Sequence, residues 1–293
     1  MPVQPPVDRP VELGPINSTD VERVAAFLSD HLNSRVSATA WAAAMTQHWV
    51  DDAPNHGFLL HSGEDVVGAY LAFYSEREID GHVERFCNLG AWCVLEDYRS
   101  HGLRLIRAML AQRGYTFTDL SPSGNVVPLN KRLRFTLLDT TTAVVPNLPW
   151  PTPGRGVRIT SDPATIRATL SGRDLQIFDD HEDAAAARHL LVTDGGQSCY
   201  VILRRDRRKR LPIFGSILYV SNPDLFHDAT RQISRHLLVR HGVLATLAEL
   251  RVVGPRPRAS LMLRNPRPKM FKSDRIVAGQ VDYLYSELTS VAW

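Results

Sequence analysis

A segment near the middle of the chain limits what the sequence can fold into more than any other feature. Pro146-Asn147-Leu148-Pro149-Trp150-Pro151-Thr152-Pro153-Gly154 contains four prolines. Each proline lacks a backbone donor and has a fixed φ, so neither a helix nor a central strand can continue through the segment. We therefore expect two domains, residues 1–148 and residues 155–293, each long enough to bury its own core.

The two halves begin alike, with a short apolar strand followed by a polar helix start. Val11-Glu12-Leu13 precedes Asn17-Ser18-Thr19-Asp20 in the first half, and Val157-Arg158-Ile159 precedes Thr160-Ser161-Asp162-Pro163 in the second. Side chains of this kind cap the N-termini of helices. The repetition predicts two copies of one strand-helix plan.

Composition is that of a globular protein from a reducing compartment. Of the 293 residues, 44% are hydrophobic and 22% are charged, which excludes a disordered or fibrous chain. Cys87, Cys93 and Cys199 form no CxxC motif and no Cys/His cluster, so neither a disulfide framework nor a metal site is expected. We find no apolar run typical of a signal peptide or a membrane span, and we expect a cytoplasmic protein without a membrane partner.

Hydrophobic periodicity predicts an α/β (α+β) protein with mixed, mostly antiparallel sheets flanked by helices. The first half reads as strand, two helices, three strands, helix, strand, helix and strand. Its later elements are a long strand over Val83 to Leu95, a helix over Ser100 to Arg113, strands over Tyr115 to Leu120 and Phe135 to Val145, and a short helix between them. The second half is predicted to contain paired strands over Cys199 to Leu203 and Ile213 to Val220, a helix from Asn222 to Arg240, and a strand over Leu244 to Val253.

The most informative stretch runs from Asn88 to Arg104, where a strand ends in a short polar turn and a helix begins. A helix N-terminus presents unpaired N–H groups and about half a positive charge, so such a turn can hold a phosphate or a pyrophosphate. Arg99, His101 and Arg104 would add positive charge. The alternative is a plain strand-to-helix connection with solvated arginines, and the residues alone do not choose between the two.

This stretch resembles the pyrophosphate loop of the GNAT acyltransferase superfamily, in which Arg/Gln-x-x-Gly-x-Gly/Ala follows a strand ending in Val-x-Pro-x-Tyr. The positions that match are Val94, Tyr98, Arg99 and Gly102. Glu96 stands where proline is usual, and Arg104 replaces the last small residue. The resemblance covers residues 11 to 145. The second half resembles the family only in its order of elements, which implies a degenerate GNAT-like domain with a basic C-terminal segment.

The resemblance implies an acyl-CoA site on the strand that ends near Leu95, with acyl-CoA as a co-substrate and no tightly bound cofactor. The pantetheine arm would enter a splay between this strand and the strand from Tyr115. A backbone N–H near Trp92 to Val94 would stabilise the oxyanion. The positions implied to bind the donor are Trp92, Cys93, Val94, Leu95, Arg99, His101, Gly102, Leu103 and Arg104.

A neutral amine has to attack the thioester, whereas a lysine-like amine has a pKa of roughly 10.4, so we expect a base that removes its proton. Asn88 lies near the position of the family's general-base glutamate, and an amide cannot act as a base. Glu84 on the same strand face and Asp119 on the adjacent strand are the substitutes. Their alternatives are a solvated strand-end glutamate and an aspartate that caps the following turn. Tyr98, Ser121 or water would protonate the leaving thiolate.

The run Arg204-Arg205-Asp206-Arg207-Arg208-Lys209-Arg210 lies between two predicted strands. We expect a solvated hairpin tip that keeps a strand edge soluble. The alternative is a docking patch for an acidic carrier protein, a phosphorylated substrate or nucleic acid. Between Arg251 and Arg275 there are eight basic residues and one acidic residue, but no aromatic residues at stacking intervals, so nucleic-acid binding is not expected.

These observations predict an enzyme that transfers an acyl group, acetyl foremost, to an amine. The donor would be coenzyme A or an acyl carrier protein, and the acceptor a small molecule or a cell-envelope or natural-product precursor. Two alternatives stay open. One is a catalytically silent acyl-CoA sensor or scaffold, indicated by the missing base and the altered last position of the loop. The other is an aminoacyl-type tandem GNAT transferase with a bulkier donor.

Overall fold

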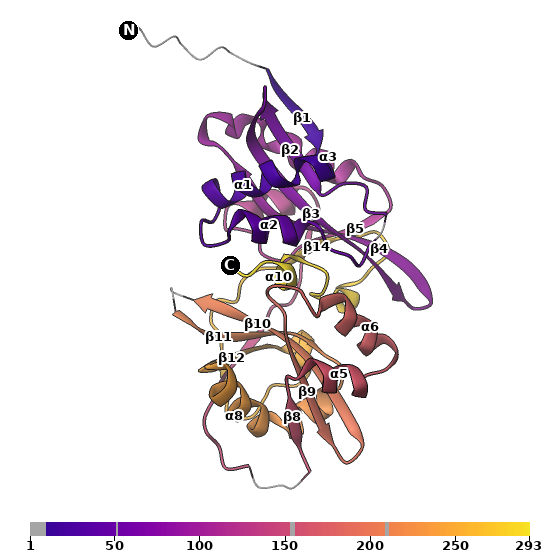
Figure 1. Cartoon of the computed structure of the whole chain (residues 1–293), viewed down its shortest axis with the longest axis vertical. Helices are drawn as coiled ribbons and strands as arrows, with labels where there is room; N and C mark the ends of the chain where they lie inside the picture. Colours follow the sequence, from indigo (N-terminus) through magenta and orange to yellow (C-terminus); the bar gives the residue numbers. More distant parts are fainter. Residues whose placement is uncertain (1–9, 51, 153–155, 209–210) are drawn as a thin grey trace. The chain divides into compact units, whose positions relative to one another are not determined.

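The computed structural model describes residues 10–50, 52–152, 156–208 and 211–293, and Figure 1 labels the main helices and strands. The chain divides inside one strand into two compact units, Met1–Thr118 with Trp293, and Asp119–Ala292. Each unit is built around a sheet flanked by helices. The domain limits expected from the proline segment, 1–148 and 155–293, stay a prediction.

The first unit consists of one sheet with helices on it. In chain order its elements are β1 (Val11–Pro15), η1 (Ser18–Asp20), α1 (Val21–His31), α2 (Ala38–Met45), β2 (Gly57–Ser62), β3 (Asp65–Ile79), β4 (His82–Val94), η2 (Glu96–His101), α3 (Gly102–Ala111) and β5 (Tyr115–Asp119). The strands lie in the order β1-β2-β3-β4-β5. Neighbours are antiparallel from β1 to β4, whereas β4 and β5 are parallel.

Helical spacing of apolar residues explains how the helices of the first unit attach to its sheet. In α1, Val24, Ala25 and Leu28 are completely buried, as a 3.6-residue period predicts. Helices α1 and α2 contact each other and β3, and α3 contacts β2 and β3. Trp41 of α2 is fully buried and packs edge-on against Trp293, with ring centroids 5.5 Å apart.

The second unit starts at the last residue of β5. Its elements are α4 (Val126–Arg132), β6 (Thr136–Leu137), β7 (Thr142–Pro146), β8 (Arg158–Thr160), α5 (Pro163–Thr169), α6 (Gly172–His181), β9 (Arg188–Asp194), β10 (Gln197–Arg208), β11 (Leu211–Val220), α7 (Pro223–Asp228), α8 (Thr230–His241), β12 (Ala245–Glu249), α9 (Leu250–Val253), β13 (Leu261–Met262), β14 (Met270–Lys272), η3 (Ala278–Gln280) and α10 (Glu287–Ser290). The main sheet has the order β13-β7-β12-β11-β10-β9-β8, and β6 pairs with β14.

The second sheet repeats the pattern of the first. Strands β11 and β12 are parallel, and the other strand pairs between described residues of this sheet are antiparallel. One face buries an apolar cluster that includes Leu190, Val201 and Ile217 of the strands and Ile233 and Leu237 of α8. Within the described ranges, no helix is long and apolar enough to cross a membrane.

Three elements expected from the sequence are wrong in extent. The strand expected over Leu244 to Val253 ends at Glu249, and Leu250–Val253 form helix α9, in which the Gly254 N–H donates to the Leu250 carbonyl. The strand expected over Phe135 to Val145 is split into β6 and β7, because the Asp139 carboxylate accepts hydrogen bonds from the Thr141 N–H (2.9 Å) and hydroxyl (2.6 Å) in a local turn. The helix expected from Asn222 to Arg240 is α7 and α8, which are separated at Ala229. The Thr230 hydroxyl donates to carbonyls of α7 at this break.

The basic run was expected to form a hairpin tip, and this is wrong for its first part. Residues Arg204 to Arg208 belong to β10, and Lys209 and Arg210 lie outside the described residues. Arg204 is 4% exposed and its Nη1 donates to the Leu288 carbonyl at 3.1 Å. Asp206 is 7% exposed and accepts hydrogen bonds from Ser216 and Arg267, both at 3.0 Å. Strand alternation therefore separates a buried Arg204 from its exposed neighbours.

The alternation predicts different costs for two arginines of β10. Arg204→Ala should lower the free energy of unfolding by about 2 to 3 kcal/mol, because it removes a charged donor from a buried carbonyl. Arg207→Ala, the control on the exposed face, should change it by less than about 0.5 kcal/mol. Urea unfolding of both variants measures the difference, and equal effects would contradict the assigned strand register.

Candidate functional site

The site expected from the sequence lies where β4 and β5 stop pairing. Their parallel register runs from Arg85 opposite Tyr115 to Asn88 opposite Thr118. Strand β5 ends one residue later, whereas β4 continues to Val94. Asn88 is 1% exposed, and its Nδ2 donates to the Thr118 hydroxyl at 3.0 Å and to the Thr118 carbonyl at 3.4 Å. Asn88 thus binds the two strands together at the point beyond which the β4 edge runs on alone.

A β-bulge interrupts β4 in this continuing part. Ala69 of β3 faces Cys93, but Leu71 faces Gly90, so β4 contains one residue more than β3 between these pairs. Ala91 has a φ of 54°, in the left-handed region that a residue with a Cβ rarely adopts. A bulge takes a residue out of the ladder and changes the direction of the neighbouring backbone groups. The Trp92 ring stacks on Tyr70 at 4.8 Å between centroids.

The strand ends in a turn that leads directly into α3. The Leu95 N–H donates to the Val67 carbonyl at 2.9 Å, and the Tyr98 N–H donates to the Leu95 carbonyl at 3.0 Å. Helix α3 begins at Gly102, beside Val94 and Trp92. A Cβ added at Gly102 would lie 3.6 Å from a Val94 methyl group and 3.8 Å from the Trp92 ring. The helix start therefore packs closely on the end of β4.

The charged residues expected around this turn point in different directions. Arg99 is exposed and forms a 2.8 Å ion pair with the exposed Glu96. Arg104 donates from Nη1 to the Val11 carbonyl of β1 at 2.8 Å, and the same nitrogen lies 3.4 Å from Nδ1 of His101. The Arg104 guanidinium is thus attached to β1, which leaves Arg99 as the exposed arginine of the turn.

Three further positions implied by the resemblance lie on the same segment. Leu103 is 44% exposed on the first turn of α3. Tyr98 in η2 is half-buried. Cys93 is half-buried as well, and this burial raises the pKa of its thiol, which keeps it protonated and makes it a poor nucleophile.

Asp119, the last residue of β5, is a buried carboxyl group with neutral hydrogen-bond partners. It is 4% exposed and accepts a hydrogen bond from Nδ2 of the fully buried Asn130 at 2.7 Å. Burial first, and the negative charge of Glu287 second, raise the pKa of Asp119 to about 7, although bonds from Asn130 and the Ser121 backbone lower it. A group with this pKa is present in both protonation states near neutral pH and can take up or give a proton.

Glu287 comes from the C-terminal segment, far from Asp119 in the sequence. It is fully buried, and its Oε1 accepts a hydrogen bond from the Ser121 hydroxyl at 2.6 Å. The sequence indicates Asp119 but neither Glu287 nor the role of Asn130, because no local pattern links these positions. The Ser121 hydroxyl is engaged by this carboxylate, which argues against Ser121 as the acid that protonates a thiolate.

Glu84, the other candidate base, lies at the opposite end of the paired strands. It is 7% exposed and faces Arg77 across β3 and β4. It precedes Trp92 by eight residues of strand, about 26 Å at 3.3 Å per residue. Of the two carboxylates, Asp119 is the one at the end of the pair where β4 continues.

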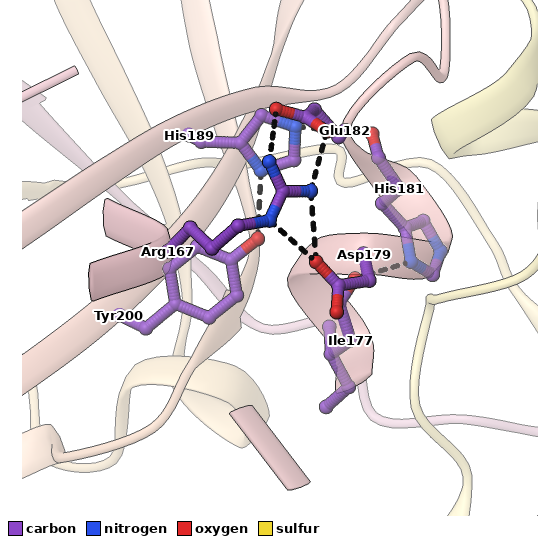
Figure 2. A network of polar contacts seen from close by, with 7 residues as sticks. All are labelled: Arg167, Ile177, Asp179, His181, Glu182, His189 and Tyr200. Atoms are coloured by element: carbon purple, nitrogen blue, oxygen red, sulfur yellow. Dashed lines mark hydrogen bonds and ion pairs between the residues drawn. The ribbon is translucent and has the colours of Figure 1, made fainter. Parts of the chain in front are cut away.

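A second polar network, in the other unit, contains residue types that are common in active sites, but its histidine has no ring nitrogen available for catalysis. Figure 2 shows this network, which is formed by Arg167, Ile177, Asp179, His181, Glu182, His189 and Tyr200. His189 Nε2 donates to the His181 carbonyl at 3.1 Å, so Nδ1 accepts from the Tyr200 hydroxyl at 2.7 Å. Burial lowers the pKa of His189 to about 4. Both ring nitrogens are engaged, and we interpret the network as an attachment of α6 to the sheet.

Asp119 should make stability depend on pH. In the unfolded chain an aspartate has a pKa of about 3.9, so between about pH 4 and pH 7 the folded state holds a proton that the unfolded state has lost. The free energy of unfolding should therefore decrease as the pH rises through this window. Asp119→Asn should remove this contribution, a difference in slope of up to about 1.4 kcal/mol per pH unit.

Urea unfolding at several pH values between about 4.5 and 7.5 measures both slopes. Glu64→Gln, at an exposed position of the first unit, is the control and should follow the parent. Parallel curves for Asp119→Asn and the parent would contradict the raised pKa.

We compared the sequence and the structure of the chain with known proteins. No family model matches the chain, and no curated protein matches its sequence. A GCN5-related N-acetyltransferase from Anabaena variabilis is 10% identical, with a TM-score of 0.56 over 89% of this chain and 72% of that one. One from Kribbella flavida is 14% identical, with a TM-score of 0.53 over 90% and 71%.

The N-myristoyltransferase of Saccharomyces cerevisiae, solved with bound myristoyl-CoA, covers more of this chain. It is 10% identical, with a TM-score of 0.52 over 97% of this chain and 84% of that one. Likeness at such low identity shows the fold. The chain has the fold of the GCN5-related N-acetyltransferases, which confirms the predicted fold class.

Proposed function

We propose that the protein is an acyltransferase that moves an acyl group, acetyl foremost, from coenzyme A to an amine. One observation carries the proposal. Beyond Asn88 the edge of β4 is no longer paired with β5, and this unpaired part contains the bulge at Ala91 and leads to the start of α3 at Gly102. The fold shared with N-acetyltransferases supports it.

The donor would bind along β4 and over the turn into α3. The N–H groups that follow Gly102 in this ten-residue helix, together with Arg99, would hold the pyrophosphate, since the Gly102 N–H donates to the Arg99 carbonyl. The pantetheine arm carries amide groups, which can pair with backbone groups of the β4 edge beyond Asn88 as an added strand would. The Arg104 guanidinium donates a hydrogen bond to the Val11 carbonyl of β1, so we do not assign Arg104 as a phosphate ligand.

The chemistry requires an oxyanion donor, a base and an acid. The thioester carbonyl would accept a hydrogen bond from a backbone N–H at the bulge, near Trp92 to Val94, as negative charge develops on its oxygen. The amine attacks, so a carbon–nitrogen bond forms and the carbon–sulfur bond breaks. Asp119 takes the proton that the amine loses, and the thiolate leaves with a proton from Tyr98 or from water.

Donor binding should separate the two arginines of the turn. Arg99→Ala should weaken coenzyme A binding about tenfold, close to 1.4 kcal/mol, because it removes an exposed cation from the pyrophosphate. Arg104→Ala should leave this affinity within about twofold but lower the free energy of unfolding by about 1 kcal/mol, because it removes a bond to β1. Titration calorimetry and urea unfolding measure the two effects.

Arg107→Ala, at an exposed position of the same helix, is the matched control and should change neither quantity. If coenzyme A does not bind the parent at millimolar concentration, the donor assignment is wrong. If Arg104→Ala weakens binding as much as Arg99→Ala, the Arg104 side chain moves to the ligand and the assignment of roles has to be reversed.

Turnover should depend on Asp119 more than on Glu84. Asp119→Asn should lower kcat at least a hundredfold with donor affinity nearly unchanged, because it removes proton transfer and keeps the hydrogen bond from Asn130. Glu84→Gln should stay within about threefold, since Glu84 lies about 26 Å along the strand from the bulge. Thiol release from acetyl-CoA with a panel of amines measures both. Bound donor without release of thiol for any amine would favour the silent sensor instead.

A further inference from the structure

Helix α8 of the second unit carries positive charge and has no acidic residue of its own. Its residues Thr230–His241 include three arginines and two histidines, namely Arg231, Arg235, His236, Arg240 and His241, and no acidic residue. The apolar side of the helix is buried through Ile233 and Leu237, whereas the three arginines are exposed. The arginines therefore do not serve the packing of the helix.

A groove borders the first half of α8. It has a volume of about 870 Å³ and is lined by α7 and α8, by the segment Val145 to Thr152, and by the segment Pro255 to Ala259. Arg231 lies over the Trp150 ring at 5.7 Å, and Arg235 donates to the Thr152 hydroxyl at 3.3 Å. Arg256 and Arg258 also line this groove. The Trp150 ring thus lies in a groove that Arg231, Arg256 and Arg258 also line, although these arginines are far from Trp150 in the sequence.

More basic side chains gather at the other end of the helix. The rings of His236 and His241 are 5.3 Å apart, and both Nε2 atoms lie near the Ser161 hydroxyl, at 3.4 and 3.2 Å. Arg205 donates to the His241 carbonyl. Burial, together with the neighbouring positive charges of Arg205 and Arg188, lowers the pKa of His241. Burial lowers the pKa of His236 to about 4, with His241 and Arg240 as further causes.

We define the α8 surface by these groups: Arg188, Arg205, Arg231, Arg235, Arg240, Arg256, Arg258, His236 and His241. Asp224 and Asp228 line the groove, and Asp162 follows Ser161 in the chain. Together these described residues have seven guanidinium groups and three carboxylates, an excess of four positive charges. The net charge of the whole chain is only +3, so the net positive charge of the α8 surface exceeds that of the entire chain.

The form of this surface fits a linear polyanion. Helix α8 alone is about 18 Å long, and cations lie along it and beyond both ends, a distance that one phosphate or one carboxylate does not span. The cations along it are arginines, whose planar fork matches phosphate oxygens, because the lowered pKa values of His236 and His241 favour their neutral rings. The groove adds a ring and a guanidinium plane on which a base can stack, and it contains Thr152, Asp228 and Gln232, which can pair with base edges.

From these features we infer that the α8 surface binds single-stranded nucleic acid, with phosphates on the arginines and one base in the groove against Trp150 and Arg231. This differs from the expectation drawn from the sequence, which found no aromatic residue interleaved with the basic ones. The fold supplies one from the proline segment. The inference does not rest on the proposed acyl transfer.

Fluorescence anisotropy of a dye-labelled twelve-nucleotide oligouridylate with the full chain tests it. Binding through about four phosphates should weaken roughly fiftyfold between about 50 and 200 mM salt. Arg231→Glu with Arg235→Glu should weaken binding at least tenfold, as should Arg256→Glu with Arg258→Glu. Arg107→Glu with Arg113→Glu makes the same change of charge at exposed positions of the first unit and should stay within about threefold.

Two comparisons decide the class of ligand. Trp150→Ala should weaken binding of the oligonucleotide about tenfold and leave binding of inorganic polyphosphate of equal charge unchanged. An acidic peptide of twelve glutamates should bind at least tenfold more weakly than the oligonucleotide. Equal binding of that peptide would overturn the inference in favour of an acidic protein partner, and so would the absence of oligonucleotide binding at about 50 mM salt, or loss of binding in the control pair.

Discussion

The candidate acyl-transfer site depends on where the parallel pairing of β4 and β5 ends. The Asn88 amide donates a hydrogen bond to Thr118 at the last pair, so the two strands are held together there. Strand β4 continues beyond this pair to Val94 and contains a β-bulge on the way. A parallel pair offers no hairpin to close it, and its strands can part without a loop that covers the opening. The same residue that cannot act as a base therefore has a structural part in the site, because it marks the position at which a donor could replace β5 as the neighbour of β4.

The second half keeps this strand framework but has a different helix start where the first half is proposed to bind the pyrophosphate. Strands β11 and β12 are parallel from Phe214 opposite Ala245 to Ser216 opposite Leu247, and β11 then has an extra residue at Leu218, as β4 has at Ala91. The helix that follows differs. It starts with Asn222 and Pro223, and the Asn222 side chain accepts the Leu225 N–H, so the donors that a phosphate would use are missing or engaged. Helix α7 has only six residues, against ten in α3, so fewer peptide dipoles are aligned toward an anion at its N-terminus.

How much the sequence could predict depended on the distance over which each feature is encoded. The long strand, the turn and the start of α3 follow from local periodicity and from a short motif, and they were predicted nearly to the residue. Strand alternation in β10 was missed, because seven charged residues follow Leu203 with no apolar residue among them, so that the buried Arg204 and Asp206 resemble the exposed Arg205 and Arg207. The partners of Asp119 and the ring at the α8 surface could not be predicted. Glu287 and Trp150 reach them only through the fold, and a single sequence contains no signal for such contacts.

The two acids that end the parallel strands show why one half is the better candidate for proton transfer. Asp119 and Glu249 are each the fifth and last residue of their strand, and both are buried. Glu249 accepts a 2.6 Å bond from Lys269 and lies 3.8 Å from Arg251, with the Tyr283 hydroxyl as a further donor. These three partners hold the Glu249 carboxylate in a fixed structural role. Asp119 is surrounded instead by the Asn130 amide, the Ser121 backbone N–H and the Glu287 carboxylate, none of which is a cation. Its pKa is therefore raised to about 7, and it is partly protonated near neutral pH. A buried acid in that state costs stability in the folded chain, and it is the kind of group that an enzyme can use.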